Sequence, residues 1–158
     1  MKATILSGVP GSGKSTYGES LITYQLASPP VIGEIYSADH YFTNPYTGEY
    51  NFDPAKLGAA HSSCLLGFIG ATSAHSPRVI VDNTNTTAVE IAPYYQVALA
   101  YGYDVEIVTV MVNHGDLAKC AERNKHGVPL KSIIRMADNI KRRVLPPYWN
   151  HRTIEATF

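Results

Sequence analysis

Residues 8–15 read Gly8-Val9-Pro10-Gly11-Ser12-Gly13-Lys14-Ser15 and fit the pattern G-x-x-x-x-G-K-[S/T]. A short apolar run, Ala3 to Ser7, precedes this stretch, and a run with helix-compatible spacing, Lys14 to Ala27, follows it. This order of strand, glycine-rich loop and helix is what a phosphate-binding loop requires. The stretch therefore predicts a P-loop at the start of an α/β fold.

The residue types in the loop predict how a nucleotide binds there. Glycines let the backbone wrap closely around phosphate oxygens, and the helix N-terminus adds donors and positive potential. Lys14 is expected to reach the β- and γ-phosphates of ATP, Ser15 to offer its hydroxyl to Mg²⁺, and Thr16 to contact the α-phosphate. The predicted nucleotide-binding residues are Gly8, Pro10, Gly11, Ser12, Gly13, Lys14, Ser15 and Thr16.

The rest of the chain alternates between strand-like and helix-like segments. The further predicted strands are Val31 to Ser37, Val79 to Val81 and Val105 to Val112. The further predicted helices are Pro54 to Thr72, a helix capped by Thr86 or Thr87 that ends at Ala100, Asp116 to Asn124 and Leu130 to Val144. This alternation predicts the P-loop NTPase fold, in which helices flank both faces of a mostly parallel sheet. No linker or repeat interrupts residues 1–158, which are expected to form one domain.

An acid follows the second predicted strand. Asp39 comes two residues after the segment Val31 to Ser37, at the carboxyl edge of the sheet, where open α/β folds bind their ligands. A carboxylate that accepts a proton from the acceptor hydroxyl is a recurring part of phosphoryl transfer. Asp39 is the predicted catalytic base, and capping of a turn is the alternative role.

A second acid, Asp82, follows the apolar strand Val79 to Val81 and is delivered to the same edge. An acid in this place is typical of the carboxylate that binds hydrated Mg²⁺. We expect Ser15 and Asp82 to form the metal site. Asn83 and Asn85 are expected to cap helices and form turns rather than to contact a ligand.

The charge is unevenly distributed although Lys and Arg balance Asp and Glu at thirteen each. From Leu117 onward there are nine basic and three acidic residues. Residues 123–129 join two basic helices through Gly127 and Pro129, as in a mobile helical lid that carries an arginine. Arg123 is the predicted catalytic arginine, offsetting charge in the transition state. A solvated helix face is the alternative.

The remaining composition bounds the class of protein. A net charge of zero provides no global field for nucleic acid. Two widely spaced cysteines, Cys64 and Cys120, suit a reduced cytoplasmic protein. The N-terminal apolar run is too short for a signal peptide or a membrane span, so we expect a cytoplasmic protein with no membrane partner.

Five aromatic residues crowd one segment between turn signals. They are Tyr41, Phe42, Tyr46, Tyr50 and Phe52. Rings in such a loop can stack on the bases of a single-stranded nucleic acid. They can also form a small core of the loop itself, which we expect for most of them.

Taken in order, these motifs resemble the kinase domain of the 5′-polynucleotide kinase family, within the wider P-loop kinases that include AAA-type ATP-binding and zeta-toxin-like enzymes. The matching segments are GVPGSGKST (8–16), SADHYF (37–42), VIVDNTN (79–85), ERNKHGVP (122–129) and IIRM (133–136). A subgroup of the family has a G-x-Y-x-F insertion, which residues 48–52 also resemble. The resemblance implies that Lys14 and Ser15 hold ATP and Mg²⁺, that Asp39 is the general base and that Arg123 is a lid arginine.

The sequence departs from that family at two positions that bear on the acceptor. Members that act on nucleic-acid ends carry an arginine where this chain has Phe42, and a second lid arginine near His126. The first hypothesis is an ATP-dependent kinase of a 5′-hydroxyl end of DNA or RNA. The alternatives are a kinase of a small molecule, nucleoside or hydroxylated base, and a non-catalytic ATP-binding switch. A GTPase is disfavoured because Asn124-Lys125 lacks the rest of an N-K-x-D signature. The sequence does not indicate the oligomeric state.

Overall fold

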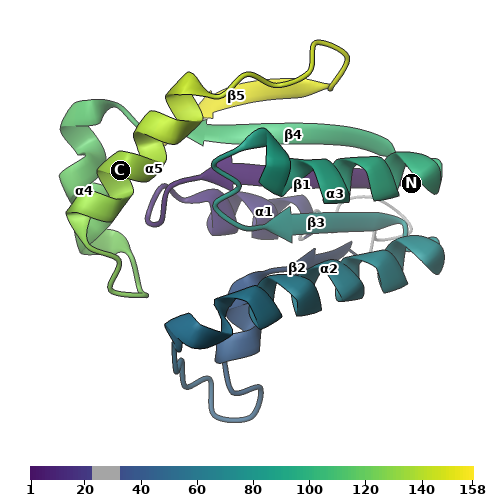
Figure 1. Ribbon diagram of the computed structural model, residues 1–158, viewed down its shortest axis with the longest axis horizontal. Coiled ribbons are helices and arrows are strands. Elements are labelled where there is room, and N and C mark those ends of the chain that lie inside the picture. Colours follow the sequence, from purple (N-terminus) through teal and green to yellow (C-terminus); the bar gives the residue numbers. More distant parts are fainter. Residues whose placement is uncertain (23–32) are drawn as a thin grey trace.

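The sheet is the centre of the fold in the computed structural model, which describes residues 1–22 and 33–158 (Figure 1). Its strands are β1 (Lys2–Gly8), β2 (Gly33–Tyr36), β3 (Arg78–Asp82), β4 (Asp104–Met111) and β5 (His151–Glu155). Within the described residues they form one five-stranded sheet in the order β2-β3-β1-β4-β5. Each neighbouring pair is parallel. The predicted α/β class with a parallel sheet is confirmed.

Helices cover both faces of this sheet. They are α1 (Lys14–Ile22), α2 (Leu57–Ser73), α3 (Ala88–Ala100), α4 (Leu117–Arg123) and α5 (Leu130–Arg142), with short 3-10 helices η1 (Ala38–Phe42), η2 (Pro54–Lys56) and η3 (His114–Asp116). Figure 1 shows α2 and α3 in front of the sheet and α1 behind it. The flanked arrangement is that of the predicted P-loop NTPase fold.

The central strand β1 is buried on both faces. Ile5 packs with Phe68 of α2 and Ile91 of α3, whereas the next residue, Leu6, packs on the α1 side with Tyr17. Successive side chains of a strand point to opposite faces, so a strand covered on both sides needs a continuous apolar run. This is why residues 3–6 show no alternation of polar and apolar residues.

The helices α4 and α5 form a hairpin at the carboxyl edge of the sheet, on the left of Figure 1. Their apolar sides close over the P-loop in a separate buried cluster of Val9, Leu117, Cys120, Ile133 and Ile140. The hairpin is called the lid below. Its position beside the P-loop agrees with the helical lid that the sequence predicts.

Two predicted elements extend beyond the described residues. The helix predicted over Lys14 to Ala27 is confirmed as far as Ile22, and residues 23–27 lie outside the described part. The strand predicted over Val31 to Ser37 appears as Gly33–Tyr36, and its first two residues lie outside that part. Among the described helices, none has the length and apolar character needed to span a membrane.

The C-terminal end differs from the prediction in two respects. The helix predicted to continue to Val144 ends at Arg142, because Arg143 is extended with φ −64° and ψ 143°. Val144 is 85% exposed rather than part of the apolar face. The strand β5 was not predicted, since His151–Glu155 has mostly exposed side chains and lies at the sheet edge.

Candidate functional site

The P-loop connects β1 to α1 and depends on glycine at one close approach. A Cβ atom on Gly11 would lie 2.2 Å from the carbonyl oxygen of Cys120 in α4, and its φ of +76° is in the left-handed region. Glycine adopts such a conformation without strain. At Gly13 a Cβ would meet no described atom within 4 Å, so space remains on that side of the loop. The loop thus packs against the lid on one side and is open on the other.

Lys14 and Asp82 face each other below the open side of the P-loop. Lys14 Nζ lies 4.0 Å from Asp82 Oδ1, and the two side chains are 12% and 10% exposed. This oxygen has no hydrogen-bond partner among the described residues, nor has the buried Ser12 hydroxyl. A buried carboxylate oxygen without a donor is costly unless a ligand satisfies it.

Asp82 and Ser15 have the oxygen atoms that a divalent metal ion needs as ligands. Mg²⁺ prefers oxygen ligands and keeps several waters, so it typically takes one or two protein oxygens together with phosphate oxygens. Ser15 is exposed in the first turn of α1, and Asp82 is the last residue of β3, with its Oδ1 4.0 Å from Lys14 Nζ. The unpartnered Asp82 oxygen and the Ser15 hydroxyl are a suitable pair of donors for that ion.

Asp39 is placed by hydrogen bonds to the backbone of η1. The Ser37 hydroxyl caps η1 by accepting a bond from Asp39 N at 3.2 Å. The buried Asn83 side chain accepts a bond from Ala38 N at 2.8 Å, so the residue after Asp82 fixes the segment that carries Asp39. Asn83 therefore has a structural role, and it also lines the cleft described below.

Two aromatic side chains contact the Asp39 carboxylate. Tyr50 donates its hydroxyl to Asp39 Oδ1 at 3.0 Å. His126, from the tip of the lid, places Nε2 at 3.5 Å from Asp39 Oδ2. Burial, followed by the negative charge of Asp39, raises the pKa of Tyr50 above its usual value, so this hydroxyl remains a donor at neutral pH. Sequence reasoning did not find either contact.

Arg123 lies at the C-terminal end of α4 and contacts the end of the chain. Its Nη1 donates to the Thr157 carbonyl oxygen at 2.9 Å, and the guanidinium lies 5.2 Å from the centre of the Phe158 ring. Lys119, one helical turn earlier, lies 5.3 Å from the same ring. Such contacts between cations and an aromatic face are weakly attractive at exposed sites. Arg123 is thus held in the structure by the C-terminal segment.

One cleft of about 750 Å³ brings most of the predicted site residues together. The predicted residues that line it are Pro10, Gly11, Gly13, Lys14, Ser15, Thr16, Asp39 and Arg123. Gly8, Ser12 and Asp82 do not line it and lie beneath its surface, buried. Tyr50, Phe52, Leu57 and His61 also line it, and Tyr50 contacts Asp39. The cleft thus has a P-loop end and an aromatic end, and Asp39 belongs to its wall.

Arg143, a weaker candidate than Arg123 for a lid arginine, instead contacts the strand that precedes the P-loop. Its guanidinium donates to Ser7 Oγ and the Asn85 carbonyl at 2.6 Å each, and to Thr109 Oγ1 at 2.5 Å. Burial lowers the pKa of Arg143, and the charge of Glu90 partly offsets this effect. The arginine therefore joins the end of α5 to β1, β4 and the segment that follows β3.

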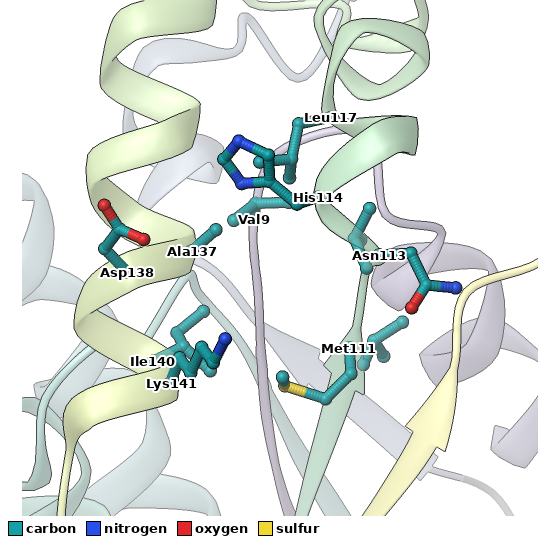
Figure 2. Close-up of a pocket in the computed structure, with 11 residues that line it drawn as sticks. Val9, Met111, Asn113, His114, Leu117, Ala137, Asp138, Ile140 and Lys141 are labelled. Atoms are coloured by element: carbon teal, nitrogen blue, oxygen red, sulfur yellow. The ribbon is translucent and has the colours of Figure 1, made fainter.

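A second cavity, of about 350 Å³, lies between β4, η3 and α5 (Figure 2). Its lining is mainly apolar, from Val9, Met111, Leu117, Ala137 and Ile140. The side chains of His114, Asp138 and Lys141 also line it. None of the predicted site residues contributes to it, so this cavity is separate from the cleft.

Comparison with known proteins identifies the family. A family model described as an AAA domain matches residues 4–142, which include the P-loop, both acids and the lid. The chain belongs to this family. NEDD4-binding protein 2 of Homo sapiens is 34% identical to this AAA domain over 149 residues. The alignment covers 90% of the chain and 8% of that protein, so the chain spans only a small part of its relative.

Solved structures share the fold of this AAA domain. A chain in a structure of the Pnkp1/Rnl/Hen1 RNA repair complex superimposes with a TM-score of 0.66 and 19% identity, covering 89% of this chain and 44% of that one. A sugar kinase from Janibacter sp. HTCC2649 superimposes with a TM-score of 0.61 and 15% identity, covering 98% and 85%. The fold is that of the P-loop kinases.

Proposed function

We propose that the chain is an ATP- and Mg²⁺-dependent phosphotransferase that phosphorylates the 5′-hydroxyl of a DNA or RNA end. The observation that carries this proposal is that Lys14 of the P-loop and the carboxylate of Asp39 line the same cleft. A phosphate-binding lysine and a carboxylate in one cleft are the two parts that transfer to a hydroxyl needs. A non-catalytic ATP-binding switch needs only the first of them.

Each residue has a distinct role in this proposal. Lys14 binds the β- and γ-phosphates, and Ser15 and Asp82 hold the metal. Bound Mg²⁺ supplies positive charge beside the phosphates. Asp39 accepts the proton of the attacking hydroxyl, and Arg123 offsets charge at the γ-phosphate after leaving its contact with Thr157. Exclusion of water by the lid prevents hydrolysis of ATP.

Two observations support a nucleic-acid end as the acceptor. Arg123, Lys125 and Arg135 line the lid side of the cleft, where they can contact the phosphates of a polymer as well as those of ATP. A chain of an RNA repair complex has the same fold, and a nucleic-acid end is accordingly proposed as the acceptor of this chain. We further propose that residues 1–158 act as a single domain. The buried thiols of Cys64 and Cys120 suit a cytoplasmic location.

A second candidate keeps the chemistry and changes the acceptor to a nucleoside, a hydroxylated base or another small molecule. It is favoured by the side chains around Asp39, where Phe52, Leu57 and His61 line the cleft. Aromatic and apolar walls with few polar groups are typical of small-molecule pockets.

The test is transfer of label from γ-labelled ATP, with Mg²⁺, to 5′-hydroxyl DNA and RNA oligonucleotides. We expect Asp39→Asn to lower turnover by about 10² to 10⁴-fold while ATP still binds, because a general base contributes about this much. Asp53→Asn is the matched control, since Asp53 caps η2 outside the cleft and asparagine can cap equally well. Label on nucleosides or sugars alone would support the second candidate. ATP binding without transfer to any acceptor would support the switch.

A further inference from the structure

The two oxygens of Asp39 are both in contact with side chains in this structure. Tyr50 donates to Oδ1 at 3.0 Å, and His126 Nε2 lies 3.5 Å from Oδ2. The His126 ring also lies on Tyr50, with ring centroids 4.2 Å apart and planes inclined by 46°. A nitrogen heterocycle therefore contacts the Tyr50 ring in a tilted arrangement and directs a polar atom at the carboxylate that we propose as the base.

Tyr50 is the fixed member of this arrangement. Its backbone pairs with Thr43 in an antiparallel bridge, and Asn51 N donates to the Phe42 carbonyl at 2.9 Å. Its ring packs edge-on against the buried Phe42, and the Phe52 ring lies parallel to it at 6.5 Å. The aromatic segment thus forms a small core around Phe42 that holds the Tyr50 ring beside Asp39.

His126 is the member that can move. It lies at the tip of the lid, next to Gly127, whose φ is +65°. Hydrogen bonds between Asn124 and Val128 stabilise this tip, and the His126 side chain takes no part in them. Its side chain is 35% exposed. Displacing the imidazole from Asp39 requires no change in the sheet or in the core around Phe42.

We propose that the terminal base of the acceptor stacks on Tyr50 in the place that the His126 ring occupies here, so that Tyr50 is a specificity-determining residue. This inference rests on the proposed function and names the part of the acceptor that the site recognises. Stacking of a base on an aromatic side chain tolerates any base, because every base has a π-face. With the imidazole displaced, Asp39 Oδ2 becomes accessible to the acceptor hydroxyl, which the sugar holds beside the stacked base.

These contacts are sufficient for transfer of the phosphoryl group to the acceptor. The acceptor oxygen forms a bond to the γ-phosphorus while its proton passes to Asp39 Oδ2. The bond from the γ-phosphorus to the bridging oxygen breaks, and ADP leaves with that electron pair. The Tyr50 hydroxyl continues to donate to Oδ1 throughout, so it also orients the carboxylate.

The experiment compares two 5′-hydroxyl oligonucleotides that are identical except that the terminal nucleotide of one has no base. Steady-state transfer from γ-labelled ATP is measured for wild type, Tyr50→Leu and Tyr50→Phe, with Tyr46→Leu as control because Tyr46 is 96% exposed in the same segment. We expect wild type to have a KM about tenfold lower for the oligonucleotide with a terminal base. Tyr50→Leu should lose this preference, and Tyr46→Leu should keep it.

The phenylalanine variant separates the two contributions of Tyr50. Tyr50→Phe keeps the ring and removes the bond to Oδ1, so the preference for a terminal base should remain while kcat falls by about three- to tenfold. His126→Ala should lower the acceptor KM, because the acceptor no longer displaces the imidazole. His114→Ala, in the separate cavity, should leave that KM unchanged.

The outcomes separate this inference from the proposed function. If wild type phosphorylates both oligonucleotides with equal KM, stacking on Tyr50 is wrong and the kinase assignment stands; this comparison needs no variant and is independent of folding defects. A higher acceptor KM in His126→Ala would also contradict the displacement. If neither oligonucleotide is labelled, the proposed function fails and this inference fails with it.

Discussion

Lys14 Nζ lies 4.0 Å from Asp82 Oδ1, at the junction of the P-loop and the end of β3, with both side chains largely buried. This separation is longer than a hydrogen bond, and Asp82 Oδ1 has no donor among the described residues. Because the two buried charges do not form a hydrogen bond with each other, each can still bind a charged group of a ligand. Phosphate oxygens and a divalent cation are the complementary pair.

Lys14→Ala is expected to weaken ATP binding by at least about tenfold and to abolish most transfer. Removal of the ammonium leaves Asp82 as an unpaired buried charge next to the phosphates, which adds repulsion to the lost attraction. Calorimetric titration with a non-hydrolysable ATP analogue measures the affinity. Lys56→Ala is the control, since Lys56 is exposed and pairs with Asp53 outside the cleft. Equal affinities for Lys14→Ala and wild type would contradict the P-loop assignment.

Arg123→Ala is expected to lower kcat more than the affinity for ATP. The guanidinium is held by Thr157 and Phe158 without a nucleotide, so its interaction with the γ-phosphate is expected to form mainly in the transition state. Steady-state kinetics and calorimetry together give the two quantities. Arg142→Ala removes an exposed lid arginine that pairs with Asp138, and this variant should change neither quantity. Equal losses of kcat and affinity in Arg123→Ala would be incompatible with a lid arginine of this kind.

Gly11→Ala is expected to disrupt the P-loop. The new Cβ would lie 2.2 Å from the Cys120 carbonyl oxygen at a φ of +76°, so the loop or α4 must shift. We expect loss of ATP binding, together with a lower free energy of unfolding. Gly70→Ala is the matched control, since Gly70 lies in α2 with no described atom within 4 Å of the added carbon. The free energy of unfolding of that variant, measured by chemical denaturation, should be about 0.5–1 kcal/mol higher than that of wild type.

Arg143→Met is expected to lower the free energy of unfolding by about 2 kcal/mol or more. Ser7 and Thr109 each lose a charged donor, and bonds of that kind contribute about 1.5–3 kcal/mol each. Urea denaturation followed by Trp149 fluorescence measures the effect. Arg142→Met, with its exposed ion pair to Asp138, should change stability by less than about 0.5 kcal/mol. A similar small change for Arg143→Met would show that its three bonds are not stabilising.

The sequence was informative where local patterns decide the structure. The P-loop, the buried strands and the acids that end them follow from residue type and spacing, and the Thr87 cap of α3 follows from its chemistry. The contacts of Tyr50 and His126 with Asp39 could not be predicted in this way. They join segments that are distant in sequence, and their geometry depends on how two loops fold.

The structural role of Arg143 and the strand β5 were not predicted, for related reasons. A single arginine after a basic helix looks like any solvated residue until the sheet that accepts its bonds is known. The short strand β5 has no clear alternation, because as an edge strand it exposes most of its side chains. The contact of Arg123 was not predicted either. Its predicted role concerns a nucleotide, whereas in the structure it donates to the Thr157 carbonyl oxygen.

The bonds of Arg143 also bear on how the lid moves. The first helix of the hairpin, α4, follows β4 in the chain through η3. The second helix, α5, is followed by Arg143, which donates hydrogen bonds to Ser7 and Thr109 of the sheet. Both ends of the hairpin are therefore connected to the sheet, one by the chain and the other by the hydrogen bonds of Arg143. We expect its travel to be largest at the tip around His126 and to fade toward the sheet. In such an enzyme, a new acceptor would enter when the few residues at the tip of the lid move, without a movement of the whole hairpin.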